Sequence, residues 1–64
     1  MLHIYVDTKH VAMIDQQPKA ADSYRPEEPW LLLHNSGRVD RFASQREARQ
    51  EARKTYGFVL FKRT

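Results

Sequence analysis

The sequence predicts an α+β fold, a small two-layer domain with one helix on a mostly antiparallel sheet. Short apolar runs alternate with polar residues and are separated by turn residues, which is typical of paired strands. One later segment has a helix-start signal, an alanine stripe and a glycine end. At 64 residues the chain is expected to form a single domain, 1–64, with the element order β-β-loop-β-β-α-β.

The first expected element is a hairpin. Leu2, Ile4 and Val6 alternate with more polar residues, so we expect a strand with one buried face over 2–7. Three polar residues turn the chain, and the apolar run Val11 to Ile14 supplies the second strand. A five-strand plan in so short a chain leaves at least one edge strand unprotected. Because the run 11–14 carries little charge, we expect it to be that edge, where a homodimer would form by strand pairing.

A long loop is expected between the second and third strands. Residues 16–29, QQPKAADSYRPEEP, contain all three prolines and little that can be buried. Proline removes a backbone donor and restricts the residue before it, so regular structure is disfavoured. Little burial offsets the cost of fixing this backbone, about 1–2 kcal/mol per residue, so we expect a mobile loop. Its acidic charge suggests that it folds back over the basic half of the chain and screens it.

A second hairpin follows the loop. The apolar content of 30–34 predicts a strand, and 38–42 is expected to return beside it. Asn35-Ser36-Gly37 supplies the turn, since glycine adopts positive φ at no steric cost.

The segment after this hairpin predicts a helix. Ser44 is the expected N-cap, and Glu47 three residues later completes the capping-box pattern. Gly57 is expected to end the helix. The stripe that would face the sheet consists of Ala48, Ala52 and Tyr56.

Because an alanine stripe is thin, the sheet must supply the bulk of the core. The candidate residues are Leu31 or Leu32, Phe42, Phe58 and Leu60. The last strand is expected over 58–61, and Lys62 and Arg63 close the chain.

The sequence contains no constellation that predicts catalysis or a cofactor. Zinc sites need three or four ligands at characteristic spacings. The three histidines, His3, His10 and His34, lack such spacing and are interpreted as surface residues. His3 and His10 could face each other across the first hairpin. The serines are each explained by a loop, a turn or a cap, and no glycine-rich phosphate loop is present. We therefore expect a protein that is not an enzyme and binds no cofactor or metal.

The sequence also carries expectations about location. The longest apolar run is far shorter than the roughly 20 residues that span a bilayer, and no signal-peptide pattern opens the chain. Cysteine is absent. A cytoplasmic location, in the producing or an infected cell, is therefore expected, without a membrane partner.

Charge is divided unevenly along the chain. Residues 1–37 carry three basic and five acidic residues, a net −2, whereas residues 38–64 carry eight basic and three acidic ones, a net +5. On the predicted helix three arginines fall on one edge, and neighbouring strands could extend the patch. Arginine favours bidentate contacts to carboxylate or phosphate, although such a patch is also typical of a solvated helix face. The expected partner-binding residues are Arg38, Arg41, Arg46, Arg49, Arg53, Lys62 and Arg63.

The layout of residues 30–64 carries a resemblance. Its elements are the Trp30-led hairpin, the helix start Phe42-Ala43-Ser44-Gln45-Arg46-Glu47-Ala48, Tyr56, the pair Gly57-Phe58 and a basic final strand. This layout resembles the small phage-encoded inhibitors of bacterial RNA polymerase. The resemblance implies contacts from an acid in the first hairpin strand and from arginines on the final strand. Lys62 and Arg63 agree with that pattern, whereas His34 stands where the acid is expected.

These observations predict a non-enzymatic regulator or inhibitor that docks on a host macromolecular machine, with RNA polymerase as the machine that the resemblance suggests. Its contacts would come from the basic helix edge and the final strand. The alternative is a nucleic-acid-binding protein that places the same arginines on phosphates. DNA-binding modules of three strands and a helix, such as integrase arm-binding domains, have a similar layout.

Overall fold

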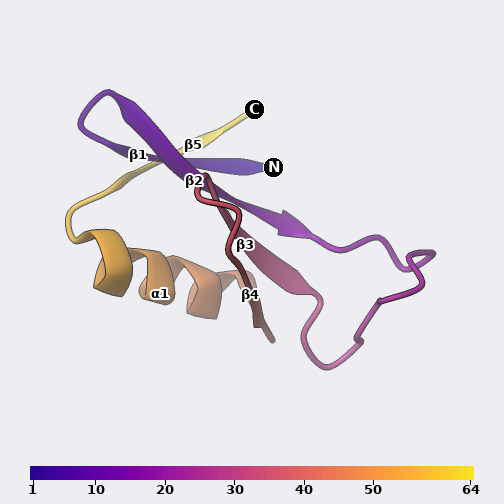
Figure 1. Cartoon of the computed structure of the whole chain (residues 1–64). Coiled ribbons are helices and arrows are strands. Elements are labelled where there is room, and N and C mark those ends of the chain that lie inside the picture. The colour runs from indigo at the N-terminus through magenta and orange to yellow at the C-terminus, as the bar shows by residue number, and fades with distance from the viewer.

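Five strands form one antiparallel sheet in the order β4-β3-β2-β1-β5, and the single helix lies on one of its faces (Figure 1). The computed structural model describes all residues, 1–64. The elements are β1 (Leu2–Val6), β2 (Lys9–Gln16), β3 (Trp30–His34), β4 (Val39–Phe42), α1 (Gln45–Tyr56) and β5 (Leu60–Arg63). The predicted α+β fold and its element order are confirmed.

The core lies between α1 and the centre of the sheet. Its fully buried large side chains are Ile4, Ile14 and Leu32, and Ala48 and Ala52 of the helix are also completely buried. Alanine has no side chain beyond Cβ, so the helix backbone approaches the sheet closely while the strands supply the bulk. The predicted alanine stripe is therefore confirmed, and Leu32, not its neighbour Leu31, faces the helix.

Two residues expected in the core lie on the surface instead. Phe58 is 89% exposed and Leu60 is 47% exposed. Phe58 lies outside the last strand, which begins at Leu60, and Leu60 pairs with Tyr5 and faces away from the helix. Residues 57–59 are needed to carry the chain from the helix layer to the edge of the sheet, since each extended residue spans only about 3.3–3.6 Å.

The prediction that 11–14 forms an exposed edge is wrong. β2 is the central strand, paired on one side with β1 and on the other with β3. After the helix the chain forms β5, which pairs with β1. The first hairpin, β1 and β2, therefore has a strand on each side and lies in the middle of the sheet. The free edges are β4 and β5, so no second copy can pair with β2 through its backbone.

Both ends of α1 have the expected caps. The Ser44 hydroxyl accepts a hydrogen bond from the backbone N–H of Glu47 at 3.2 Å. The Glu47 carboxylate reaches back one residue further than a capping box requires, accepting from the N–H of Ala43 at 3.1 Å. Gly57 has a φ of 80°, and its N–H donates to the carbonyl of Arg53 at 2.8 Å. These contacts satisfy backbone groups that the helix itself leaves unpaired.

The long loop is one residue shorter than expected because β2 continues through Gln16. The N–H of Gln17 donates to the carbonyl of Pro29 at 2.7 Å and closes the base of the loop. The side chain of Gln17 is buried, donating to the Ser23 hydroxyl and accepting from Arg41. The middle of the loop extends away from the helix (Figure 1), whereas Glu27 and Glu28 near its end line a depression together with helix residues. Its mobility in the free protein stays a prediction.

Removing the N-cap should destabilise the domain without changing its fold. Ser44→Ala deletes the hydroxyl that accepts from Glu47, and such losses cost about 1 kcal/mol. We expect a decrease of that size in the free energy of unfolding, measured by urea denaturation. Gln50→Ala, an exposed change in the same helix, is the control and should alter stability by less than about 0.5 kcal/mol. Equal stabilities of the two variants would contradict the capping role.

Candidate functional site

The exposed part of α1 has two chemically different flanks. On one flank a shallow groove of about 350 Å³ is lined only by polar side chains, from Gln45, Arg46, Arg49, Gln50 and Arg53. We call this the arginine groove. The other flank borders a wider depression of about 650 Å³, whose lining includes four acids, Glu27, Glu28, Glu47 and Glu51. The helix therefore places three arginines on one flank and its two glutamates, with Lys54 beside them, on the other.

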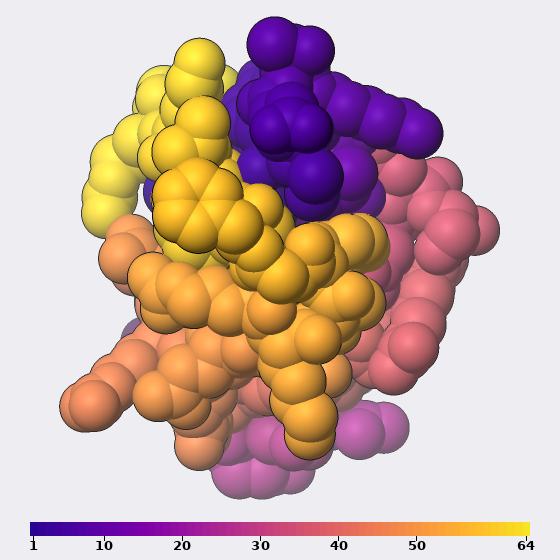
Figure 2. Space-filling model, turned by 90° about the vertical axis from the view of Figure 1, so that its left-hand side faces the viewer, coloured from indigo at the N-terminus to yellow at the C-terminus, as the bar shows by residue number.

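Two of the groove's arginines rest on an aromatic ring of the last strand. The guanidinium carbon of Arg49 lies 5.3 Å from the ring centroid of Phe61, and that of Arg53 lies 5.1 Å from it. Such contacts attract a cation to the ring face and restrict the motion of a long side chain. Phe61 is itself half-buried and packs against the core. The space-filling view shows the C-terminal strand (yellow) lying directly against the helix (orange) (Figure 2).

Arg63 extends the arginine groove along β5. It lies two residues after Phe61 on the same strand, so both side chains are on the helix side of the sheet. Arg63 and Gln45 also line one small depression near the start of the helix. The groove thus continues from α1 onto the last strand, as the sequence predicted for Arg46, Arg49, Arg53 and Arg63.

The other three predicted binding residues do not join this surface, so of the neighbouring strand residues only Arg63 extends the patch. Lys62 points to the opposite face of the sheet, where its ammonium lies 5.3 Å from the ring centroid of Tyr5. Arg38 and Arg41 belong to the turn and strand at the β4 edge, and the sheet order places that edge furthest from β5. Arg38 pairs with Asp40, and Arg41 donates to Gln17 at 2.8 Å.

The loop acids do not screen the groove in this structure. Glu27 and Glu28 lie beside Glu47 and Glu51 on the other flank of the helix. The base of the loop is anchored to the end of β2 and to β3, which keeps it on the side of the sheet away from β5.

Phe58 is a surface feature that sequence reasoning missed. With 89% of its area exposed, it is the most exposed large apolar residue of the chain, and it follows the end of the helix from which Arg53 projects. A residue directly after a helix-ending glycine normally packs on apolar residues of the last turn. Here those positions are Arg53, which is charged, and Ala52, which is buried against the sheet, so the sequence of the last turn was the available signal that Phe58 has little to cover it.

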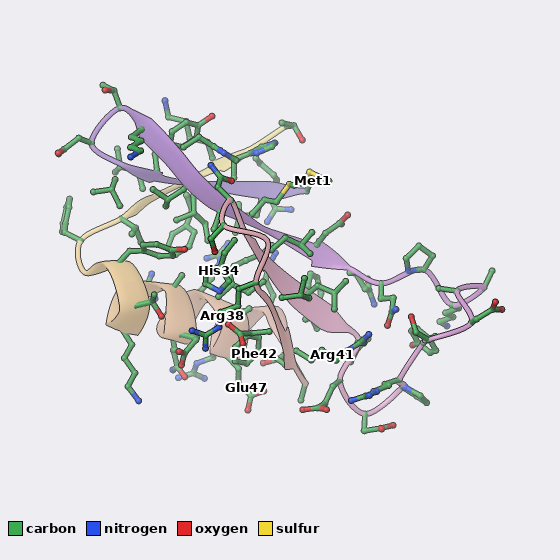
Figure 3. All side chains as sticks on the ribbon, in the orientation of Figure 1. Met1, His34, Arg38, Arg41, Phe42 and Glu47 are labelled. Atoms are coloured by element: carbon green, nitrogen blue, oxygen red, sulfur yellow. The ribbon has the colours of Figure 1, made fainter.

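His34 is buried and not on the surface as expected. Its Nδ1 contacts the hydroxyl of Tyr56, and its Nε2 lies 2.8 Å from the carboxylate of Asp40. Arg38 then binds Asp40 through Nε at 3.2 Å. Figure 3 shows His34 and Arg38 close together beside the second hairpin. A neutral imidazole satisfies both neighbours, accepting from the tyrosine and donating to the carboxylate, so this network fastens the last turn of α1 to β3 and β4.

The remaining histidines meet across the first hairpin, as their positions suggested. Nδ1 of His3 lies 2.9 Å from Nε2 of His10. A bulge in β1 and β2 places His10 opposite Tyr5, on the same side of the sheet as His3. No group of three or more histidine, cysteine, aspartate or glutamate residues comes together in an arrangement that would hold a metal ion. The helix α1 also lacks the length and apolar character needed to cross a membrane.

No protein-family model, curated protein or solved structure matches this chain.

The network around Asp40 predicts an acid-sensitive contribution to stability. The hydrogen bond from His34, assisted by Arg38, holds the pKa of Asp40 below its ordinary value of 3.8. A carboxylate whose pKa is lower in the folded state stabilises that state above its unfolded pKa, and the contribution is lost as pH falls through the folded value. Asp40→Asn should therefore lower stability at neutral pH by on the order of 1 kcal/mol.

The measurement is urea denaturation of the wild type and Asp40→Asn from neutral pH down to pH values below about 4. The difference between the two proteins should shrink as the pH falls through that range. Asp22→Asn, in the exposed part of the loop, is the control and should follow the wild type throughout. A difference between wild type and Asp40→Asn that does not change with pH would show that Asp40 contributes no proton-linked stability.

Proposed function

We propose that this protein is a non-enzymatic regulator or inhibitor that docks on an acidic surface of a host protein through the arginine groove and β5. The observation that carries the proposal is the pair Arg49 and Arg53, held over Phe61 beside two further arginines. Bacterial RNA polymerase is the first partner to test, because of the layout of residues 30–64.

Restrained arginines suit the capture of carboxylates. A guanidinium binds a carboxylate with two parallel hydrogen bonds, and a side chain already restricted by an aromatic ring loses less freedom when it does so. Single exposed ion pairs are worth only about 0–1 kcal/mol each, so charge alone does not account for tight docking. Phe58 supplies the missing apolar anchor, since interfaces concentrate their binding energy in a few aromatic and arginine residues.

The acidic flank of α1 favours a protein over a nucleic acid as the partner. Glu47 and Glu51 lie one helix face away from the arginines, on a helix of 12 residues. A long phosphate backbone that crossed the helix would meet these carboxylates, whereas a compact acidic patch of a protein contacts the groove alone.

The composition of the groove is the observation that favours the second candidate, a nucleic-acid-binding function. All five lining residues are arginine or glutamine. Arginine binds guanine and glutamine binds adenine through paired hydrogen bonds in the major groove, and both also bind phosphates.

Neutralising the groove should weaken partner binding and leave the fold intact. The variant Arg46→Gln/Arg49→Gln/Arg53→Gln should bind purified RNA polymerase, or a partner isolated by pull-down, at least about tenfold more weakly in biolayer interferometry. The control variant Lys9→Gln/Lys19→Gln/Arg25→Gln removes the same charge from exposed positions outside the groove. Its affinity should stay within twofold of the wild type, well below a tenfold change, which corresponds to roughly 1.4 kcal/mol. Wild-type affinity in the groove variant, with circular dichroism unchanged, would remove the groove from the proposal.

The salt dependence of DNA binding separates the two candidate functions. If the second candidate holds, the logarithm of the affinity for duplex DNA should fall with the logarithm of salt at a slope of about −0.9 per phosphate contacted, about −4 for four arginines. Under the protein-docking proposal we expect no gel shift even at low salt, and Phe58→Ala should weaken capture of the protein partner. A shift at low salt that Phe58→Ala leaves unchanged would instead favour nucleic-acid binding.

A further inference from the structure

The face of the sheet opposite α1 is covered by no other helix or strand and carries a regular pattern of residues. Two rows cross β2, β3 and β4 in direct register. One row is Met13, Leu33 and Val39, and the next is Asp15, Leu31 and Arg41. None of the four apolar residues belongs to the core cluster or packs against it. We call this surface of six residues the open face.

The charges of the open face are placed symmetrically about its central strand. Asp15 on β2 and Arg41 on β4 lie on either side of Leu31 on β3. Neighbouring strands are about 4.8 Å apart, so the Cα atoms of the two residues are separated by roughly twice that distance. They form no ion pair with each other or with any other residue of the chain.

Both charged groups retain hydrogen-bonding capacity. Oδ1 of Asp15 accepts from the N–H of Gln16 at 2.9 Å, and Oδ2 makes no hydrogen bond within the chain. Arg41 uses Nη1 to donate to Gln17 at 2.8 Å, which leaves the other donors of its guanidinium available. That bond reaches a residue just beyond the end of β2, and Arg41 also lines the wider depression beside α1.

From this arrangement we infer that the open face is the contact surface between two copies of the chain. The two copies are related by a two-fold axis that runs parallel to β3 between the facing sheets. This axis places each row opposite the same row of the other copy, and β2 of one copy opposite β4 of the other. Asp15 of each copy then lies against Arg41 of the other, and Leu31 lies against its own counterpart. In the next row Met13 meets Val39, and Leu33 meets Leu33. The apolar centre and both charges are thereby satisfied at once.

The geometry of the contact is that of an ordinary sheet sandwich. Two sheets that pack face to face keep their strands within about 30° of one another, at a separation of about 10 Å. Val39 is 51% exposed in the single chain and would be covered by the second copy. The arginine groove lies on the other side of the sheet, so the dimer presents two grooves and does not depend on the proposed docking function.

The direct test is the mass of the wild-type chain by analytical ultracentrifugation from low micromolar to millimolar concentration. The mass should rise from that of a monomer, 7.6 kDa, toward twice that value. A monomer mass at every concentration would overturn the proposal. Leu33→Lys, at the centre of the open face, should hold the chain monomeric over the same range.

A charge exchange tests the pairing itself. Asp15→Arg and Arg41→Asp, made singly, each place like charges in contact and should weaken dimerisation at least tenfold, whereas the double variant should restore it. Lys19→Asp/Asp22→Arg, at two exposed positions of the loop, is the matched control and should dimerise like the wild type. Circular dichroism verifies the fold of each variant.

If Arg41→Asp fails to fold after losing its bond to Gln17, the mass of Asp15→Arg in solution still decides whether the pairing is correct. Wild-type dimerisation by Asp15→Arg would overturn the proposal, as would a folded double variant that stays monomeric.

Discussion

The close contact of Ala48 and Ala52 with the centre of the sheet is the constraint on which the rest of the structure depends. Both alanines are fully buried, and the strands facing them supply Ile4, Ile14 and Leu32. A larger residue at either alanine would lift the helix off the sheet, since interiors are packed to the density of organic crystals. The height of the helix above the strands in turn determines which side chains of its flanks reach the sheet.

Two of those flanking contacts follow from the short distance. On the β5 side, Arg49 and Arg53 come within cation–π range of Phe61. On the side of the second hairpin, the hydroxyl of Tyr56 reaches the imidazole of His34, which lies on the inner face of β3 and binds Asp40. The helix is therefore fastened to both halves of the sheet by polar or charged side chains around an apolar centre. In so small a domain these side chains have a structural role as well as any role in binding.

The same architecture leaves two chemically different surfaces. The helix side carries the arginine groove, which is strongly charged, and the exposed Phe58 follows the end of the same helix. The open face, on the opposite side of the sheet, is mostly apolar, and its two charged residues lie on either side of β3. A one-helix, two-layer fold cannot cover both faces of its sheet, and antiparallel sheets commonly tolerate one uncovered face. Here that face carries leucine, methionine and valine where a solvated sheet would carry polar residues, and for that reason it is assigned a role in self-association.

Local signals in the sequence determined the elements of this protein. The alternation of Leu2, Ile4 and Val6, the cap at Ser44 and the stop at Gly57 each act within a few residues, so strands and helix were predictable close to their observed bounds. The three helix arginines were predictable as a group for the same reason, because helical periodicity alone places them on one edge.

Only the tertiary structure decided how those elements are ordered in space. Whether β5 pairs beside β1 or β4 depends on how the chain returns from the helix, and no local pattern encodes that choice. Because β5 pairs with β1, β2 lies at the centre of the sheet and not at its edge, and Arg38 and Arg41 lie far from the groove. Lys62 of β5 faces the opposite side of the sheet. His34 was buried for a similar reason: its partners Tyr56 and Asp40 come from different elements, and only packing of the helix on the sheet brings them together. Side-chain neighbours across strands are set by register and strand order, which are long-range properties of the fold.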